Sequence, residues 1–202
     1  MPRLRTDHAP VTGLVLAAGG SSRLGRPKQL LALGGATLLD ATLATVRRCG
    51  FDQVVVAIGG AADEVEATVD LHRVDVVRNP GYGAGCSSSI AAALPVVDPE
   101  AAGLVLLLGD QPEVTPAAVA AVVSAGEGTD LAVCRYDDGL GHPFWLGREL
   151  FETLAGLHGD KAVWKLVDAA SEDLVTADVS GPVPADVDTV DDYAALQARW
   201  SR

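Results

Sequence analysis

Residues 14–35 read LVLAAGGSSRLGRPKQLLALGG. Four apolar residues lead into a run of small residues, which is followed by three basic residues and a second apolar run. A short apolar run that ends in glycine is typical of a buried strand followed by a loop. Three interpretations compete for this stretch: a secretion signal, an ordinary surface loop, or a loop that binds phosphate groups.

The composition excludes several classes of protein. The chain has 202 residues, of which 49% are hydrophobic, so we expect one domain with a sizeable core and not a disordered chain. The net charge of −12 and the absence of a large Lys/Arg cluster argue against nucleic-acid binding and favour a small, metal-bound ligand. No apolar stretch approaches the roughly 20 residues that span a bilayer, so no membrane contact is expected.

The cysteines and the N-terminus favour a cytoplasmic protein. Three cysteines lie far apart without a CxxC motif, namely Cys49, Cys86 and Cys134. This pattern indicates neither a disulfide framework nor a zinc site, and it fits a reducing compartment. A secretion signal is disfavoured because residues 7–10 interrupt the charged start and the apolar run that follows is short. We expect residues 1–12 to be a flexible segment and residues 13–202 to form a single domain.

Strand-like and helix-like segments alternate along that domain. Buried strands are expected at 14–17, 54–58, 74–77, 104–108 and 131–134, with short strands near 174–177 and 183–187. Helices are expected at 37–50, 61–70, 87–94, 115–126, 148–156, 160–170 and from 189 onward. Unbroken apolar strands that alternate with helices predict an α/β fold, a three-layer α/β/α sandwich with a Rossmann-like, mainly parallel sheet. A change of composition predicts a small lobe or insertion around residues 135–185.

The helix starts carry recognisable caps. Thr37 with Asp40 forms a variant capping box, and Asp192 is the expected capping partner at the start of the last helix. Thr115 followed by Pro116 is a typical N-cap and first helical residue.

The glycine-rich loop lies where a parallel sheet binds its ligand, outside the carboxyl ends of the strands. It matches neither the P-loop nor the GxGxxG fingerprint. Backbone N–H groups of such a loop nevertheless form an anion-binding nest, and Arg23 and Lys28 add two cations. A solvated loop with surface basic residues remains the alternative at this point.

Acidic residues supply the second half of the predicted site. Asp110 follows a deeply buried strand, where a carboxylate is costly unless it is paired or bound to a metal, although it could instead begin a turn before Pro112. Mg2+ prefers one or two carboxylates together with phosphate oxygens. Alternation places Asp186 and Asp188 on one face of a short strand, so either could be a second metal ligand, or one of them could only cap the last helix.

These motifs resemble a known family. LAAGGSSRLGRPK (residues 16–28) resembles the signature loop of the sugar-nucleotide and cofactor nucleotidyltransferases. NPGYGAGCSSSI (79–90), GDQP (109–112), GHP (141–143) and DVDTVDD (186–192) are similar to the molybdenum cofactor cytidylyltransferase branch of the MobA-like NTP transferases. The resemblance covers nearly the whole chain after residue 12, with Leu24 and Val190 as mild departures.

The resemblance implies a reaction and a set of site residues. CMP would pass from CTP to the phosphate of molybdopterin with release of pyrophosphate, with Mg2+ as cofactor and transient contact with a molybdenum hydroxylase. The nucleotide and its phosphates would be held by the backbone of Leu16, Ala17, Ala18, Gly19 and Gly20 and by Arg23 and Lys28, with Gly85 and Ser89 near the base or ribose. Lys28, Arg23 and Asp110 would be catalytic, Asp110 and Asp188 would bind the metal, and His142 would line the pterin pocket.

Other readings remain open. The same parts would serve a transferase that uses GTP or another phosphorylated acceptor, and close relatives include a nicotinamide-dependent reductase, nicotine blue oxidoreductase. A pterin chaperone without activity is a further alternative. His142 could be a turn residue and Cys86 a small buried filler, while Trp145 and Trp164 are assigned to packing.

Overall fold

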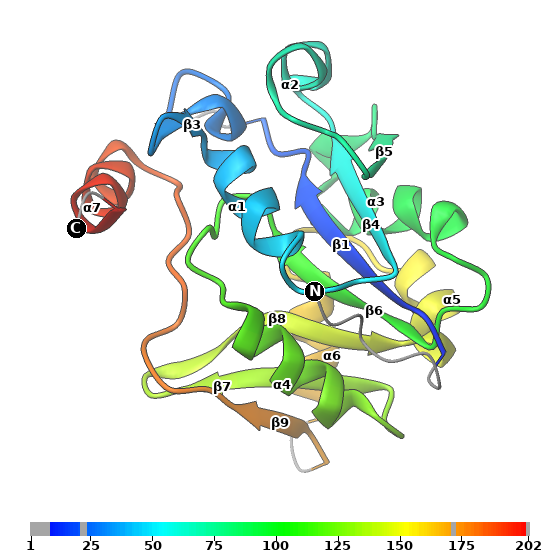
Figure 1. Cartoon of the computed structure of the whole chain (residues 1–202). Helices are drawn as coiled ribbons and strands as arrows, with labels where there is room; N and C mark the ends of the chain where they lie inside the picture. The colour runs from blue at the N-terminus through cyan, green and yellow to red at the C-terminus, as the bar shows by residue number, and fades with distance from the viewer. Residues whose placement is uncertain (1–8, 21–23, 171–172, 201–202) are drawn as a thin grey trace.

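A seven-stranded sheet runs through the centre of the molecule (Figure 1). The computed structural model describes residues 9–20, 24–170 and 173–200. The strand order is β5-β4-β1-β6-β8-β7-β9. The strands are β1 (Val11–Ala17), β4 (Gln53–Ile58), β5 (Asp75–Arg78), β6 (Gly103–Leu108), β7 (Leu131–Tyr136), β8 (Gly139–Gly147) and β9 (Val175–Asp178).

The sheet is mainly parallel, as predicted. All neighbouring strands pair in parallel except β8, which runs antiparallel to both β6 and β7. β8 was not expected from the sequence, because its glycines and Pro143 are typical of a loop. The register between β7 and β8 shifts between Val133 and Cys134, opposite Pro143. Proline is tolerated there because a bulge does not need its missing N–H group.

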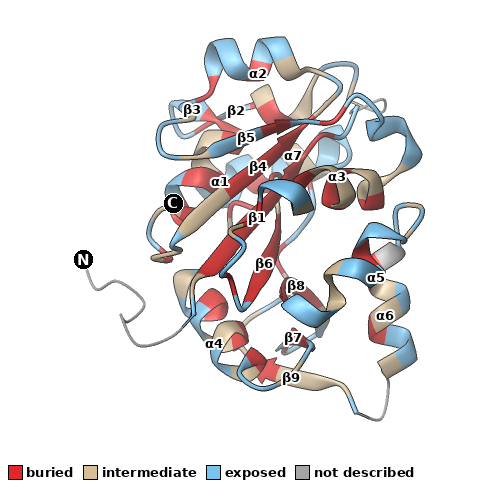
Figure 2. Cartoon of the chain, turned by 90° about the vertical axis from the view of Figure 1, so that its right-hand side faces the viewer, coloured by how far each residue is buried: buried red, intermediate tan, exposed pale blue. Residues whose placement is uncertain are grey.

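Helices cover both faces of the sheet, which confirms the three-layer prediction. One face carries α1 (Leu38–Val46), α2 (Ala62–Thr68) and α4 (Pro116–Gly126), and the other carries α3 (Cys86–Ala93), α5 (Phe151–Ala155) and α6 (Ala162–Ala170). Successive side chains of a strand point to opposite faces, so Val15 enters the first cluster while Leu14 and Leu16 enter the second. The central strand β1 is accordingly buried at every residue (Figure 2).

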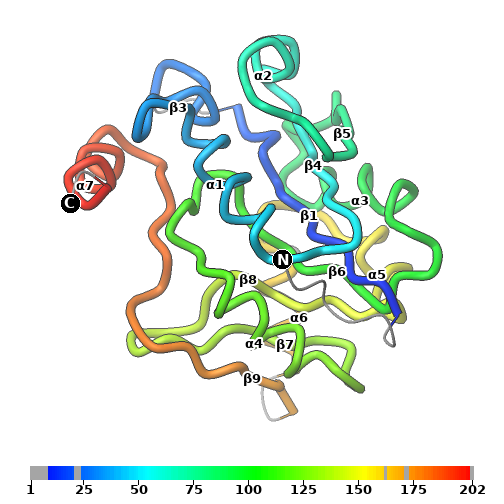
Figure 3. The backbone as a smooth tube through the Cα atoms, viewed as in Figure 1, coloured from blue at the N-terminus to red at the C-terminus, as the bar shows by residue number. Residues whose placement is uncertain are grey.

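The C-terminal segment returns to the N-terminal half of the chain. Figure 3 follows it from β9 to α7 (Val190–Trp200), which lies beside the small hairpin of β2 (Ala32–Leu33) and β3 (Ala36–Thr37). A third core cluster joins the two, made of Leu31, Leu33, Leu38, Val187 and Leu196. This packing carries residues 184–188 to the carboxyl end of the sheet. Short 3-10 helices complete the fold: η1 (Lys28–Leu30), η2 (Tyr82–Ala84), η3 (Leu94–Val96) and η4 (Arg148–Leu150).

Local predictions had mixed outcomes. The strand predicted at 183–187 is wrong: among the described residues none pairs with it as a strand, and Pro184 has no N–H to offer a ladder. α1 ends at Val46, earlier than expected.

The predicted caps are confirmed. The hydroxyl of Thr37 accepts from Asp40 N–H, and that of Thr115 accepts from Ala118 N–H. Asp192 accepts from Thr189 N–H. Over the described ranges we find no helix with the length and apolar character needed to cross a membrane.

Candidate active site at the carboxyl ends of the parallel strands

A cleft of about 260 Å³ opens where β1 and β6 end. Most residues that the sequence assigned to the site line it. These are Leu16, Ala17, Ala18, Gly19, Lys28, Gly85, Ser89, Asp110 and Asp188. They come from four separate parts of the chain, which the sheet and the returning C-terminal segment bring together.

Two predicted residues that the structure describes, Gly20 and His142, are not part of that lining. Gly20 lies next to the lining residues without belonging to them, and Arg23 lies outside the described residues. His142 lies in β8, where it is buried and its ring stacks on Phe144 with the ring centroids 4.2 Å apart. Burial lowers the pKa of His142 to about 4, so its imidazole is neutral at pH 7. A contact of His142 with the acceptor stays a prediction.

The glycine-rich loop is held closely by its neighbours. Gly60 N–H donates to the carbonyl of Ala18 at 3.1 Å, and Gly109 N–H donates to that of Leu16 at 2.9 Å. A side chain at Gly59 would place its Cβ 2.7 Å from Ala18 O, and one at Gly109 would lie 2.9 Å from Ala17 Cβ. Glycine at both positions therefore allows the adjacent strand ends to press against the loop.

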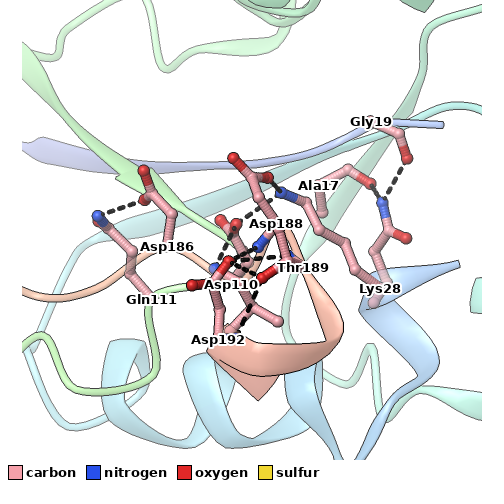
Figure 4. A network of polar contacts seen from close by, with 12 residues as sticks. Ala17, Gly19, Lys28, Asp110, Gln111, Asp186, Asp188, Thr189 and Asp192 are labelled. Carbon is pink, nitrogen blue, oxygen red and sulfur yellow. Dashed lines mark hydrogen bonds and ion pairs between the residues drawn. The ribbon is translucent and has the colours of Figure 1, made fainter. Parts of the chain in front are cut away.

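Lys28 lies between two carboxylates (Figure 4). Its Nζ is 2.6 Å from Oδ2 of Asp110 and 3.0 Å from Oδ1 of Asp188. Burial lowers the pKa of Lys28, but the charges and hydrogen bonds of these two aspartates, Asp110 above all, outweigh it and leave the pKa above its ordinary value. Lys28 is therefore an ammonium, held at a defined point of the cleft.

A third carboxylate lies close by. Gln111 donates from Nε2 to Oδ1 of Asp186 at 2.8 Å and to the carbonyl of Pro184 at 3.0 Å. Burial raises the pKa of Asp186, as do the charges of Asp110 and Asp188, and the opposing effects of Lys28 and Gln111 are weaker. Both Asp186 and Asp188 line the cleft, together with residues 16–19 of the glycine-rich loop.

The donor set fits a hard divalent cation. Asp110 and Asp188 present carboxylate oxygens to one point, the position that the Lys28 ammonium shares. Mg2+ commonly takes one or two protein carboxylates and completes its shell with water and phosphate oxygens. Within the described ranges, no group of three or more His, Cys, Asp or Glu side chains is arranged to hold a metal, so such an ion would need oxygens from a ligand.

The far wall of the cleft is the start of α3. Asn79 donates from Nδ2 to the hydroxyls of Ser88 and Ser89, at 2.9 and 3.0 Å. Asp160, from the turn before α6, accepts from the N–H of Cys86 at 3.2 Å. Burial, together with the charge of Asp160, raises the pKa of Cys86 to about 11, so this cysteine is a neutral thiol at pH 7.

Sequence reasoning assigned no site role to Gln29, Tyr82 and Asp160, whose side chains line the cleft, nor to Leu108 and Gly109 beside them. Gln29 carried a signal that could have been used, since it is a polar residue directly before an apolar run. Asp160 carried none, because only tertiary packing places its turn against α3. The two tryptophans pack as expected: Trp145 is buried, and Trp164 meets Phe144 edge-on with the centroids 5.0 Å apart.

A family model confirms the resemblance. Residues 13–174 match the model of the MobA-like NTP transferase domain, which is most of the chain. The chain belongs to this family. Its acidic cleft beside a glycine-rich loop is thus the cleft of a MobA-like NTP transferase domain.

Solved structures are similar over almost the full length of this MobA-like NTP transferase domain. A homologue of Rv0371c from Mycobacterium sp. strain JC1 is 53% identical, with a TM-score of 0.89 over 95% of this chain and 97% of that one. Rv0371c of Mycobacterium tuberculosis H37Rv, in a complex with manganese, is 48% identical, with a TM-score of 0.85 over 94% of this chain and 98% of that one.

The curated relatives match over shorter segments. Nicotine blue oxidoreductase of Paenarthrobacter nicotinovorans is 40% identical over 88 residues, which is 43% of this chain and 43% of that protein. The chain likewise spans 28% of the length of the bifunctional protein GlmU of Halorhodospira halophila. The MobA-like NTP transferase domain thus spans less than half the length of these two relatives.

Proposed function

We propose that this MobA-like NTP transferase is a cytidylyltransferase that transfers CMP from CTP to the phosphate of molybdopterin. The motifs at residues 79–90, 109–112, 141–143 and 186–192 support this choice of branch. Pyrophosphate would leave and molybdopterin cytosine dinucleotide would form. We expect the product to pass to a molybdenum hydroxylase through a transient contact.

One observation carries the proposal: the Lys28 ammonium lies between Asp110 and Asp188 at the end of the glycine-rich loop. A triphosphate needs cations and N–H donors, and a metal ion that accompanies it needs carboxylates. Two carboxylates against one ammonium leave the site net negative, which favours a divalent cation over a bare phosphate. The manganese complex of Rv0371c agrees with such a role.

The residues would act by alignment and charge neutralisation. An oxygen of the molybdopterin phosphate would attack the α-phosphorus of CTP, the bond from that phosphorus to the β-phosphate oxygen would break, and its electron pair would leave with pyrophosphate. The attacking phosphate is already ionised, so no general base is needed. Lys28 and Arg23 would neutralise the triphosphate, and Asp110 with Asp188 would hold Mg2+, which when bound supplies further charge neutralisation at the phosphates.

Nucleotide binding by calorimetry tests this proposal. CTP, GTP, ATP and NADPH are each titrated with and without Mg2+ or Mn2+. We expect CTP to bind best, and only with the metal. A preference for GTP would keep the type of reaction and replace the donor, whereas failure of every nucleotide to respond to metal would overturn the proposal.

A second candidate follows from one specific match. The similarity to nicotine blue oxidoreductase favours a nicotinamide-dependent reductase, because a loop that holds a triphosphate can also hold a dinucleotide pyrophosphate. Hydride transfer has no need of the ion pairs among Lys28, Asp110 and Asp188. Tight NADPH binding without dependence on metal would therefore favour the reductase.

A further inference from the structure

Gln29 lies beneath the glycine-rich loop, and within the described residues the hydrogen bonds of its side chain go only to that loop. It belongs to η1, lines the cleft, and has an exposed fraction of only 2%. Its Nε2 donates to the carbonyl of Ala17 at 2.6 Å and to that of Gly19 at 3.0 Å. Both hydrogen bonds therefore end on the backbone of the loop.

The opposite end of the same amide is unsatisfied. Among the described residues, Oε1 of Gln29 has no hydrogen-bond partner although it is fully buried. An orphaned buried acceptor destabilises the folded state, and an apolar side chain of the same length would avoid that cost. Packing in the core therefore does not explain why residue 29 is a glutamine. Its two hydrogen bonds to the loop indicate a role in the structure of the loop.

Those contacts help to fix three successive peptide groups. The carbonyls of Ala17 and Gly19 are held by Gln29, and the carbonyl between them, that of Ala18, is held by Gly60 N–H. In a planar trans peptide the N–H of the next residue points opposite to the carbonyl. Gln29 therefore directs the N–H groups of Ala18 and Gly20 away from itself. Adjacent glycines would otherwise leave these peptide planes free to turn.

The same short helix also carries the cation of the site. Lys28 directly precedes Gln29, and its ammonium is held by Asp110 at 2.6 Å. One 3-10 turn thus presents the positive charge and sets the backbone donors beside it. Any ligand that needs both, such as a polyphosphate, would depend on this turn staying in place.

We propose that Gln29 is a positioning residue that presets the backbone N–H groups of Ala18 and Gly20 for the phosphates of a nucleoside triphosphate. It touches no reacting atom and acts through the loop. The inference rests on the proposed function, because it assumes that this cleft binds a triphosphate. It adds a residue that none of the site motifs assigned to a role.

Calorimetric titration of CTP and of pyrophosphate, both with Mg2+, tests the inference on the full chain. In Gln29→Met the shape is kept and both donors are lost. We expect the affinity for both probes to fall roughly tenfold, the effect of about two modest hydrogen bonds. The control is Gln53→Met at the opposite end of the sheet, which removes two hydrogen bonds donated by Nε2, to Asp75 and to Val96 O, and two accepted by Oε1, from Thr12 and from Asp98 N–H. It should bind both probes as the wild type does.

Gln29→Glu supplies a readout that a purely structural role would not change. An ionised carboxylate cannot donate to the loop carbonyls, whereas a protonated one can donate to one of them. At each pH we divide the CTP affinity of this variant by that of the wild type. This ratio should rise towards 1 as the pH falls from 8 to 5.5. The same ratio for Gln29→Met should stay constant, and thermal melting establishes that each variant is folded.

The possible outcomes separate the two claims. If the wild type binds neither CTP nor pyrophosphate, the proposed function fails and the inference fails with it. If the wild type binds both and Gln29→Met binds equally well, the function stands and the positioning role is wrong. If Gln29→Met does not fold, a pH-independent affinity ratio for Gln29→Glu overturns the role by itself.

Discussion

Nζ of Lys28 and Oδ2 of Asp110 lie 2.6 Å apart, although 82 positions separate the two residues in the sequence. Asp188 completes the arrangement from the C-terminal segment, at 3.0 Å from the same ammonium. The cation and the two carboxylates therefore neutralise one another partly before any ligand enters. A divalent ion that binds to these carboxylates has to compete with the lysine, and a triphosphate offers the lysine new partners.

Removing the lysine should strengthen metal binding in the nucleotide-free protein. In Lys28→Met the two carboxylates lose the competing ammonium, so the affinity for Mn2+ should rise, roughly tenfold, while turnover is lost. Titration calorimetry with Mn2+ alone measures the first effect. The matched control is Arg199→Met, which removes a cation from an ion pair with Glu113 outside the cleft. Unchanged or weaker Mn2+ binding in Lys28→Met would show that Lys28 and the metal do not share these carboxylates.

Asp110→Asn should weaken both metal binding and catalysis. The amide keeps the size of the side chain but loses the negative charge that a divalent cation requires, so the metal-dependent rate should fall on the order of 10²-fold. Pyrophosphate release at several Mg2+ concentrations measures it. Asp75→Asn serves as control, because Asp75 lies at the start of β5, away from the cleft, and accepts a hydrogen bond from Gln53. An unaltered rate and metal dependence in Asp110→Asn would place the metal elsewhere.

Gly85→Ala should distort the wall of the cleft at α3. Gly85 has a φ of +99°, and a Cβ there would lie 2.7 Å from the backbone carbon of Gly159. We expect a loss of stability of about 1–3 kcal/mol and weaker CTP binding. Thermal melting and calorimetry measure the two effects. Gly83→Ala, where an added Cβ meets no atom within 4 Å, should change neither. Equal behaviour of the two variants would contradict this account.

His142 should make the stability of the protein depend on pH below neutrality. Burial holds the pKa of His142 at about 4, against an ordinary value of 6.5, so between these pH values the unfolded chain binds a proton that the folded chain does not. The free energy of unfolding should therefore fall as the pH drops from 6.5 to 4, by up to about 3 kcal/mol.

The test compares urea unfolding of the wild type, His142→Phe and His72→Gln at several pH values. In His142→Phe this part of the pH dependence should disappear. His72→Gln, which removes an exposed histidine, should keep the slope of the wild type. If the free energy of unfolding of His142→Phe falls with pH as steeply as that of the wild type, groups other than His142 cause the pH dependence.

The fold could be predicted closely because its signals are local. Apolar runs such as residues 104–108 identify buried strands, and the caps at Thr37 and Thr115 fix where helices start. β8 was not predicted, because its pairing with β7 includes a bulge at His142 and Pro143 of β8 that is defined only by the register of the partner strand. The strand expected at 183–187 failed for a related reason: its alternation is real, but no neighbouring strand is there to pair with it.

The sequence by itself determined the residue types of the site, a glycine-rich loop, a lysine and several aspartates at strand ends. Only the tertiary structure decided how they meet. The third core cluster carries the C-terminal segment back so that Asp188 reaches Lys28, and the same packing puts Gln29 under the loop. Hydrogen bonds and ion pairs depend on distance in space, and the separation of residues along a chain does not give that distance until the core has packed.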